Sequence, residues 1–218
     1  MNQADNYRKV AKLMVGPYYI NILDDGVASY AFKLPASADL FASHEVTETG
    51  ADFTFIISAD SLPDAYDDCI DSVSAGPSPY KICRLGQKEL LWLRYNNRDE
   101  VKLAYIISED WSRWRLIADN SGTYGIDSFF ELSYIFAYSV IKKAGLMLHG
   151  VVMEWDGMGI IVCAHSGVGK STHTSMWESR EQARIINGDK ALCYKEGNAW
   201  HSCGAPWCGS SGKFINKK

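Results

Sequence analysis

The feature that most constrains this chain is the stretch CAHSGVGKSTH, residues 163–173. A strand-like apolar run, MGIIVCA, leads into it, and a helix-like run, THTSMWES, follows it. Two glycines separated by one residue, and then Lys170, stand between the two runs. A glycine-rich loop that joins a strand to a helix directs backbone N–H groups and the helix N-terminus at one point, where they favour an anion.

This order of segments predicts a nucleotide-phosphate site, which we call the phosphate loop. Gly167 and Gly169 supply the unusual backbone angles, Lys170 reaches the β- and γ-phosphates, and Ser171 offers a hydroxyl to Mg²⁺. ATP and Mg²⁺ are therefore the expected cofactors. Ala164 stands where the usual pattern has its first glycine, a modest departure because alanine is small. The expected binding residues are Ser166, Gly167, Val168, Gly169, Lys170, Ser171 and Thr172.

A second functional group is expected at Asp189, nineteen positions after Lys170. Asp189 follows the apolar run ARIING, which predicts a strand. If this strand and the strand before the phosphate loop are parallel neighbours, their carboxyl ends lie at one edge of the sheet, where ligands of open α/β sheets bind. Asp189 then serves as a metal ligand or proton acceptor near the γ-phosphate. The alternative is that Asp189 only caps the following turn.

Three segments together resemble the HPr serine kinase family and, more widely, phosphoenolpyruvate carboxykinase-like P-loop proteins. They are HGVVMEWDGMGIIVCAHSGVGKSTHTSMW, INGDKAL and GAPWCG, and the resemblance covers residues 148–212. It implies that Lys170 binds the β- and γ-phosphates, that Ser171 and Asp189 contact the metal, and that Asp189 activates the acceptor hydroxyl. It also implies a catalytic place for His149 near the transferred phosphate. The alternative for His149 is a histidine whose ring is satisfied within its strand.

The resemblance implies a kinase that moves the γ-phosphate of ATP to a hydroxyl, on a protein serine or on a small molecule. Two departures leave alternatives open. Lys190 stands where many family members have a second acid, and the chain stops at Lys218, where relatives continue. We therefore expect a domain truncated at its C-terminus. The alternatives are a nucleotide-binding module without transfer activity and, less favoured, a carboxykinase-like enzyme.

The segment before these motifs has a different character. Strand patterns occur at 18–23, 29–34, 52–58, 88–95, 100–108 and 114–119, separated by turn residues, which indicates an antiparallel meander. An apolar helix is expected to begin with Asp127 as its N-cap and to end at Gly145, buried on most sides. The expected fold class is α+β or α/β, with a strand-rich region at 1–125 and a connecting helix at 126–146. Residues 147–218 then form a carboxykinase-like P-loop nucleotide-binding domain with a mixed sheet.

Composition excludes some partners and leaves others open. A net charge of -4 does not favour nucleic acid. No apolar run is long enough to span a membrane, and a polar start after Met1 argues against a signal peptide. We therefore expect a cytoplasmic protein whose six cysteines are reduced. Cys203 and Cys208 are close in sequence, but without a second pair of metal ligands they do not favour a metal site. Self-association into a homo-oligomer is left open.

The segment CGAPWCGSSGKF, residues 203–214, is rich in glycine and proline. This composition predicts a mobile loop at the nucleotide edge of the sheet. Trp207 is expected to place an aromatic ring against the acceptor or the base. The alternative is that Trp207 covers apolar core.

Overall fold

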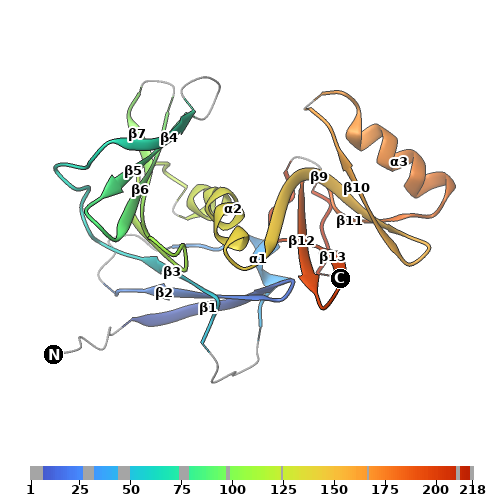
Figure 1. Ribbon diagram of the computed structural model, residues 1–218, viewed down its shortest axis with the longest axis horizontal. Helices are drawn as coiled ribbons and strands as arrows, with labels where there is room; N and C mark the ends of the chain where they lie inside the picture. The colour runs from blue at the N-terminus through green and yellow to red at the C-terminus, as the bar shows by residue number, and fades with distance from the viewer. Residues whose placement is uncertain are drawn as a thin grey trace. The chain divides into compact units, whose positions relative to one another are not determined.

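The computed structural model describes residues 7–26, 32–43, 50–73, 79–96, 99–123, 125–165, 167–209 and 212–216 (Figure 1). His44 and Ser166 lie outside these ranges. The helices are α1 (Ala36–Asp39), α2 (Ile126–Ile141) and α3 (Lys170–Arg180). The strands are β1 (Arg8–Val15), β2 (Tyr18–Asp24), β3 (Phe53–Ile57), β4 (Cys69–Val73), β5 (Tyr80–Leu85), β6 (Glu89–Tyr95), β7 (Val101–Ser108), β8 (Arg113–Asp119), β9 (Gly145–Trp155), β10 (Met158–Cys163), β11 (Arg184–Asn187), β12 (Lys190–Glu196) and β13 (Ala199–Cys203).

Contacts between residues divide the chain into two compact units. Unit 1 comprises Met1–Leu13, Tyr19–Pro35 and His44–Leu132. Unit 2 comprises Met14–Tyr18, Ala36–Ser43 and Ser133–Lys218. The phosphate loop and Asp189 both belong to unit 2. None of the helices in the described ranges is long and apolar enough to cross a lipid bilayer.

Unit 1 is built on an eight-stranded sheet in the order β1-β2-β3-β8-β7-β6-β5-β4. The strands from β4 to β8 form the expected antiparallel meander. The expectation of antiparallel pairing throughout is wrong, because β3 pairs parallel with both β2 and β8. Parallel neighbours require long connections rather than tight turns, and the chain between β2 and β3 is long enough to provide one.

A disulfide joins β4 to β5 in unit 1. Cys69 and Cys83 lie directly opposite each other in the antiparallel register and are bonded to each other. The expectation that all six cysteines are reduced is therefore wrong for this pair. The sequence shows no short-range signal for it, because the two residues are brought together only by the register of two strands.

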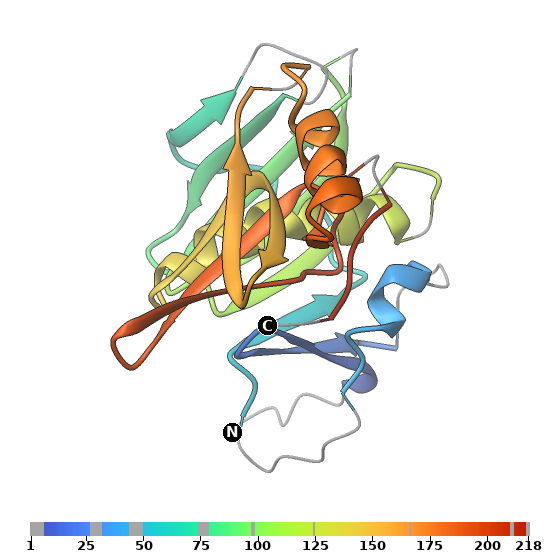
Figure 2. The ribbon, with the colours of Figure 1, turned by 90° about the vertical axis from the view of Figure 1, so that its right-hand side faces the viewer.

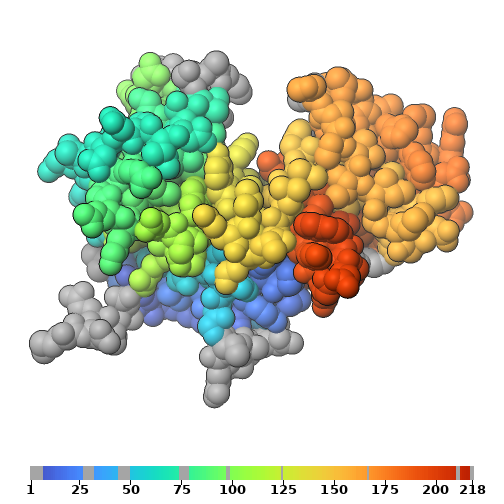
Figure 3. Space-filling view, viewed as in Figure 1, coloured from blue at the N-terminus to red at the C-terminus, as the bar shows by residue number. Residues whose placement is uncertain are grey.

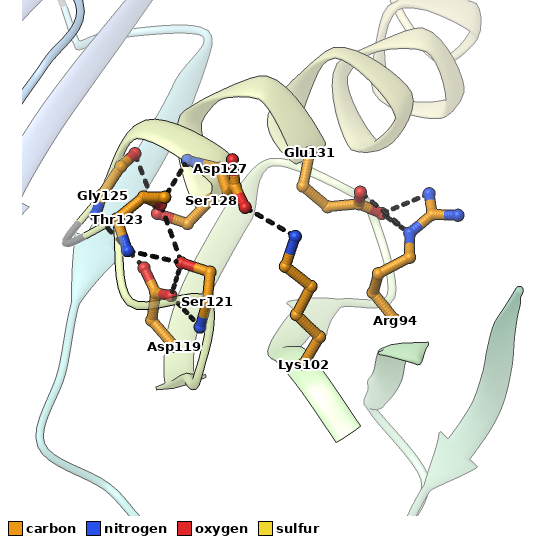
Figure 4. A network of polar contacts seen from close by, with 9 residues as sticks. All are labelled: Arg94, Lys102, Asp119, Ser121, Thr123, Gly125, Asp127, Ser128 and Glu131. Carbon is orange, nitrogen blue, oxygen red and sulfur yellow. Dashed lines mark hydrogen bonds and ion pairs between the residues drawn. The ribbon is translucent and has the colours of Figure 1, made fainter. Parts of the chain in front are cut away.

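The start of α2 is anchored to the sheet of unit 1 by a buried ion pair (Figure 4). Arg94 Nη2 lies 2.6 Å from Glu131 Oε1, and both side chains are only 7% exposed. The indole Nε1 of Trp92 donates to the same carboxylate oxygen at 2.6 Å. Nearby, Lys102 and Asp127 form a second ion pair that is about one-third exposed, with side-chain exposures of 36% and 32%. The figure shows both ion pairs on α2, of which the first is buried and the second is partly solvated.

The boundaries of α2 differ from those expected. Asp127 is not the N-cap, because it lies inside the helix and its N–H donates to Thr123 Oγ1 at 3.1 Å. The helix ends at Ile141, since the next residues form a turn before β9. Phe130, Tyr134 and Ile141 are between 41% and 58% exposed, so the helix is buried on fewer sides than expected.

Unit 2 contains a five-stranded sheet in which β9 is central. The order is β10-β9-β12-β13, and β11 also pairs with β9. The predicted hairpin is confirmed, because β9 and β10 pair antiparallel around a turn at Asp156 and Gly157. Both turn residues have positive φ, 48° and 74°, as a two-residue turn with right-handed strand twist requires.

The prediction that residues 147–218 form a carboxykinase-like α/β domain is wrong. Strands make up 47% and helices 17% of the described residues, which include three helices. Within the described part of unit 2, β9 pairs antiparallel with β10, β11 and β12, and β12 pairs antiparallel with β13. An α/β domain needs parallel strands joined by helices that cover the sheet. Here β9 separates the two strands that α3 joins, so they are not neighbours.

We predict that the two ion pairs at α2 differ in their contribution to stability. Glu131→Gln should lower the free energy of unfolding by about 3–5 kcal/mol, because it removes the carboxylate charge that is paired with the buried Arg94 guanidinium. Asp127→Asn, the matched control, should cost about 0–1 kcal/mol because its pair is partly solvated. Urea unfolding of both variants measures the difference, and equal losses would contradict this account of α2.

Candidate functional site

The strand β9 brings the two predicted site segments to the same end of the sheet. Glu154 of β9 pairs with Gly159 of β10 on one side and with Arg184 of β11 on the other. Both neighbours therefore run antiparallel to β9 and in the same direction as each other. At their ends, Cys163 of β10 pairs with Gly150 of β9, close to the end of β11. The chain segments that follow β10 and β11 consequently emerge together.

The two glycines of the phosphate loop have the backbone conformation that the sequence predicts. Gly167 and Gly169 have φ values of +84° and +97°, which confirms the prediction of unusual angles at both positions. A Cβ added at either glycine would meet nothing within 4 Å, so glycine is required there for conformation rather than for space. Gly169 is the N-cap of α3, and Lys170 is its first residue. Because glycine has no side chain, the cap residue accepts no hydrogen bond from the N–H groups of the first helical turn through a side chain.

The helix α3 lies against the β9–β10 hairpin (Figure 2) and holds the phosphate loop in place. Thr174 is 1% exposed, and its hydroxyl donates to the carbonyl of Lys170 at 3.1 Å. Trp177 packs edge-on against Trp155 of β9, with ring centroids 5.3 Å apart. The outer side of α3 remains at the surface (Figure 3). One buried threonine and one tryptophan therefore fix the helix while its start stays open.

Lys170, His149 and Asp189 form a continuous chain of polar contacts. Lys170 Nζ lies 3.3 Å from His149 Nε2, and His149 Nδ1 lies 3.1 Å from Asp189 Oδ1. A carboxylate accepts but does not donate, so His149 Nδ1 carries the proton in this pair. In the neutral ring, Nε2 then has a lone pair and accepts from the lysine. The Lys170 ammonium also donates to the carbonyls of Ala164 at 2.6 Å and His165 at 3.2 Å.

The sheet places this chain through its register. His149 of β9 pairs with Lys190 of β12, and the N–H of Gly150 donates to the carbonyl of Asp189 at 2.9 Å. Lys170 and Asp189 thus each contact His149, although the reason predicted for their proximity is wrong. The strands before them are not parallel neighbours, and His149 on the strand between them links the two side chains.

The other predicted loop residues within the described ranges lie at the surface. Val168 is 64% exposed, and Ser171 and Thr172 are exposed at the start of α3. The donors suggested for a metal are the Ser171 hydroxyl and the Asp189 carboxylate, whose side chain is 22% exposed. Both are oxygen donors, which fit Mg²⁺. No group of three or more His, Cys, Asp or Glu side chains suited to a resident metal occurs among the described residues. Nucleotide-bound Mg²⁺ needs only one or two protein oxygens.

Lys190 lies beside Asp189 instead of extending into solvent. Its Nζ is 3.7 Å from Asp189 Oδ2 and 4.6 Å from the centre of the Tyr134 ring. Its side chain is only 15% exposed. At the position where the resemblance to HPr serine kinases implies a second acid, the chain therefore has a cation held between a carboxylate and an aromatic face.

The expectation that Trp207 faces the acceptor is wrong. Trp207 is 2% exposed and packs against Phe136 of α2, with ring centroids 5.3 Å apart. Its carbonyl accepts from the side-chain amide of Asn187 at 3.0 Å. Asn187 is not among the functional residues predicted from the sequence. An available signal was its place at a strand end before Gly188, where asparagine commonly binds nearby backbone groups.

Comparisons with known proteins add no relative for this site. No family model, curated protein or solved structure matches the chain. The interpretation of the site therefore rests on its own residues and their geometry.

We predict a fixed order of reactivity for the four cysteines outside the disulfide, of which only Cys163 is exposed. Burial raises the pKa of Cys193, and the nearby Cys163 adds to the shift. Burial also raises the pKa of Cys208, as does the negative charge of Asp189. Iodoacetamide should therefore label Cys163 to completion before Cys193, Cys203 or Cys208, because all three of the latter thiols are buried and the reactive thiolate is disfavoured at Cys193 and Cys208. Peptide mass spectrometry over time measures this order, and labelling of Cys208 as fast as Cys163 would contradict it.

Proposed function

We propose that this protein is an ATP-dependent phosphotransferase, similar in chemistry to HPr serine kinases, that moves the γ-phosphate to a hydroxyl acceptor. The observation that carries the proposal is the chain of contacts from Lys170 through His149 to Asp189. It joins the lysine of a phosphate loop to a histidine–carboxylate pair that is able to accept a proton. A nucleotide-binding site alone has no need for such a pair.

Phosphate binding is the first step of the proposed reaction. The free N–H groups at the start of α3 and the positive end of its dipole favour the phosphate oxygens. Lys170 now donates to two carbonyls of the loop and to His149. Phosphate oxygens are charged acceptors and form stronger hydrogen bonds than neutral carbonyls. Lys170 therefore exchanges these partners for the β- and γ-phosphates when ATP binds.

That exchange prepares the proton acceptor. When Lys170 moves to the phosphates, Nε2 of His149 loses its donor and has a free lone pair. The acceptor oxygen then bonds to the γ-phosphorus, the bond to the β,γ-bridging oxygen breaks and ADP leaves. The hydroxyl proton passes to the pair formed by His149 and Asp189, in which Asp189 stabilises the protonated ring as the carboxylate of a catalytic triad does.

Charge neutralisation supplies the remaining part of catalysis. Phosphoryl transfer depends mainly on positioning and on stabilising charge on the phosphoryl oxygens. Lys170 provides one positive charge to these oxygens. Ser171 and Asp189 provide oxygen donors for Mg²⁺, which neutralises phosphate charge when bound with the nucleotide.

The acceptor is a protein serine or a small hydroxy compound, and nucleic acid is not a proposed partner because the chain carries a net charge of -4. A cytoplasmic location is part of the proposal, since ATP is available there. The Cys69–Cys83 disulfide is the observation against this location, because disulfides are rare in cytosolic proteins.

A nucleotide-binding module without transfer activity is the second candidate. One observation favours it: the Lys190 ammonium lies 3.7 Å from Asp189 Oδ2, where relatives carry a second acid. A cation at this distance competes with the metal for the same carboxylate. Incubation with ATP and Mg²⁺ distinguishes the candidates, because only the phosphotransferase releases ADP in amounts that depend on a hydroxyl acceptor.

We predict that Lys170→Ala weakens the binding of ATP at least about 10-fold, the equilibrium effect of losing about 1.4 kcal/mol from one charge-assisted contact. Lys195→Ala, on the exposed end of β12, is the control and should bind ATP as the wild type does. Isothermal calorimetry with Mg²⁺ present measures both affinities. Equal affinities for Lys170→Ala and wild type would remove the phosphate loop from nucleotide binding.

We further predict that Asp189→Asn binds ATP nearly as well as the wild type but transfers phosphate about 100-fold more slowly, the scale of a disabled general base, because His149 loses the carboxylate that supports it. The amide cannot stabilise a protonated His149 ring. Steady-state ADP release at saturating ATP measures the rate. Unchanged turnover in Asp189→Asn would exclude the histidine–carboxylate pair from the mechanism and leave the nucleotide-binding module as the better description.

A further inference from the structure

Asn187 is a buried polar side chain next to the candidate site whose hydrogen-bonding positions are all occupied. It is fully buried, with 0% exposure. Its amide nitrogen donates to the carbonyls of Ala205 at 2.9 Å and Trp207 at 3.0 Å. Its amide oxygen accepts from the N–H groups of Asp189 at 2.9 Å and Lys190 at 2.8 Å. One side chain thus ties the backbone of the Asp189 turn to the segment that carries Trp207.

We propose that Asn187 is a positioning residue for Asp189, and that residues 204–209 form the wall against which Asn187 holds the Asp189 carboxylate. The catalytic part of this inference rests on the proposed phosphotransferase, whereas the structural part does not. Asn187 itself does not reach the reacting atoms, because its four hydrogen-bonding positions are all occupied by backbone groups. Its effect is transmitted through the backbone of Asp189.

Gly209 gives the wall its contact with the carboxylate. A Cβ added at Gly209 would lie 2.7 Å from Asp189 Cγ and 2.9 Å from Asp189 Cβ, closer than real carbon atoms approach. Gly209 also has a φ of +56°, which favours glycine. The backbone at Gly209 therefore lies directly against the Asp189 side chain. This contact limits the positions open to Asp189, one of whose oxygens is 3.1 Å from His149 Nδ1.

The end of β11 is held on its other side as well. The N–H of Gly188 donates to the carbonyl of Lys213 at 2.9 Å, and the N–H of Ile215 donates to the carbonyl of Ile186 at 2.9 Å. Asn187 also forms a β-bridge with Phe214. Chain segments on both sides of residues 210–211 therefore contact the turn that presents Asp189. This arrangement explains why a polar residue is buried at the end of β11, directly after two buried isoleucines.

Two variants and one matched control test the proposal. Asn187→Ala removes all four side-chain hydrogen bonds. Gly209→Ala introduces a methyl group against Asp189, while Gly212→Ala introduces one at a similar positive φ of +62° with nothing within 4 Å. Comparing the two glycine variants separates displacement of Asp189 from backbone strain. Because Gly209→Ala leaves the buried hydrogen bonds in place, it keeps the test available if Asn187→Ala does not fold.

The first measurement is the tautomer of His149, read from the ¹⁵N chemical shifts of its ring at a pH where the ring is neutral. The Asp189 carboxylate holds the Nδ1–H tautomer, so Asp189→Asn defines the signal of a ring without that partner. We expect Asn187→Ala and Gly209→Ala to shift towards the Asp189→Asn signal, and Gly212→Ala to match the wild type. This measurement requires neither ATP nor transfer activity.

The second measurement separates ATP affinity from turnover. Asn187→Ala and Gly209→Ala should keep the wild-type affinity for ATP and lose about 10- to 100-fold in turnover, as expected when a reacting group moves by about 1 Å. Wild-type His149 signals in both variants, or equal effects of Gly209→Ala and Gly212→Ala, would overturn the positioning role. A shifted His149 signal in a protein that does not transfer phosphate even as wild type supports the positioning role and contradicts the proposed function instead.

Discussion

The pairing of β9 with its neighbours is the constraint on which the candidate site depends. Its register with β10 sets the position of the phosphate loop, and its register with β12 places His149 beside the Asp189 turn. Side chains alternate between the two faces of a strand, so a slip by one residue would turn His149 away from both partners. The hydrogen bond from Gly150 to the carbonyl of Asp189 fixes this register at the site itself.

Local sequence patterns correctly predicted those parts of the site whose conformation depends on residues close together in the sequence. The Asp156–Gly157 turn and the apolar runs beside it define the β9–β10 hairpin, and the glycines after it define the phosphate loop. Each feature depends on residues within a few positions of one another, because turn angles and helix starts are set locally. Asp189 is predicted at the end of a strand for a similar reason, whereas its predicted place beside the loop assumed that β10 and β11 are neighbours, which they are not.

Long-range pairings were not predictable from these patterns. An apolar strand looks the same in sequence whether its neighbour is parallel or antiparallel, so the order of β11, β9 and β10 had no signal of its own. The burial of Trp207 depends on packing against Phe136, more than seventy positions away, and glycine and proline around it indicated a loop instead. Asn187 has the composition of a turn residue, and its role depends on carbonyls that reach it from residues 205 and 207.

The account is tested most directly by a crystal structure of the protein with Mg²⁺ and a non-hydrolysable ATP analogue. It predicts that Lys170 Nζ leaves the carbonyl of Ala164 and Nε2 of His149 and binds the β- and γ-phosphates at the start of α3. It also predicts that the His149 ring, still held by Asp189, faces the γ-phosphate with its Nε2 free. A nucleotide bound elsewhere, or a Lys170 that keeps its present partners beside a bound nucleotide, would contradict the account.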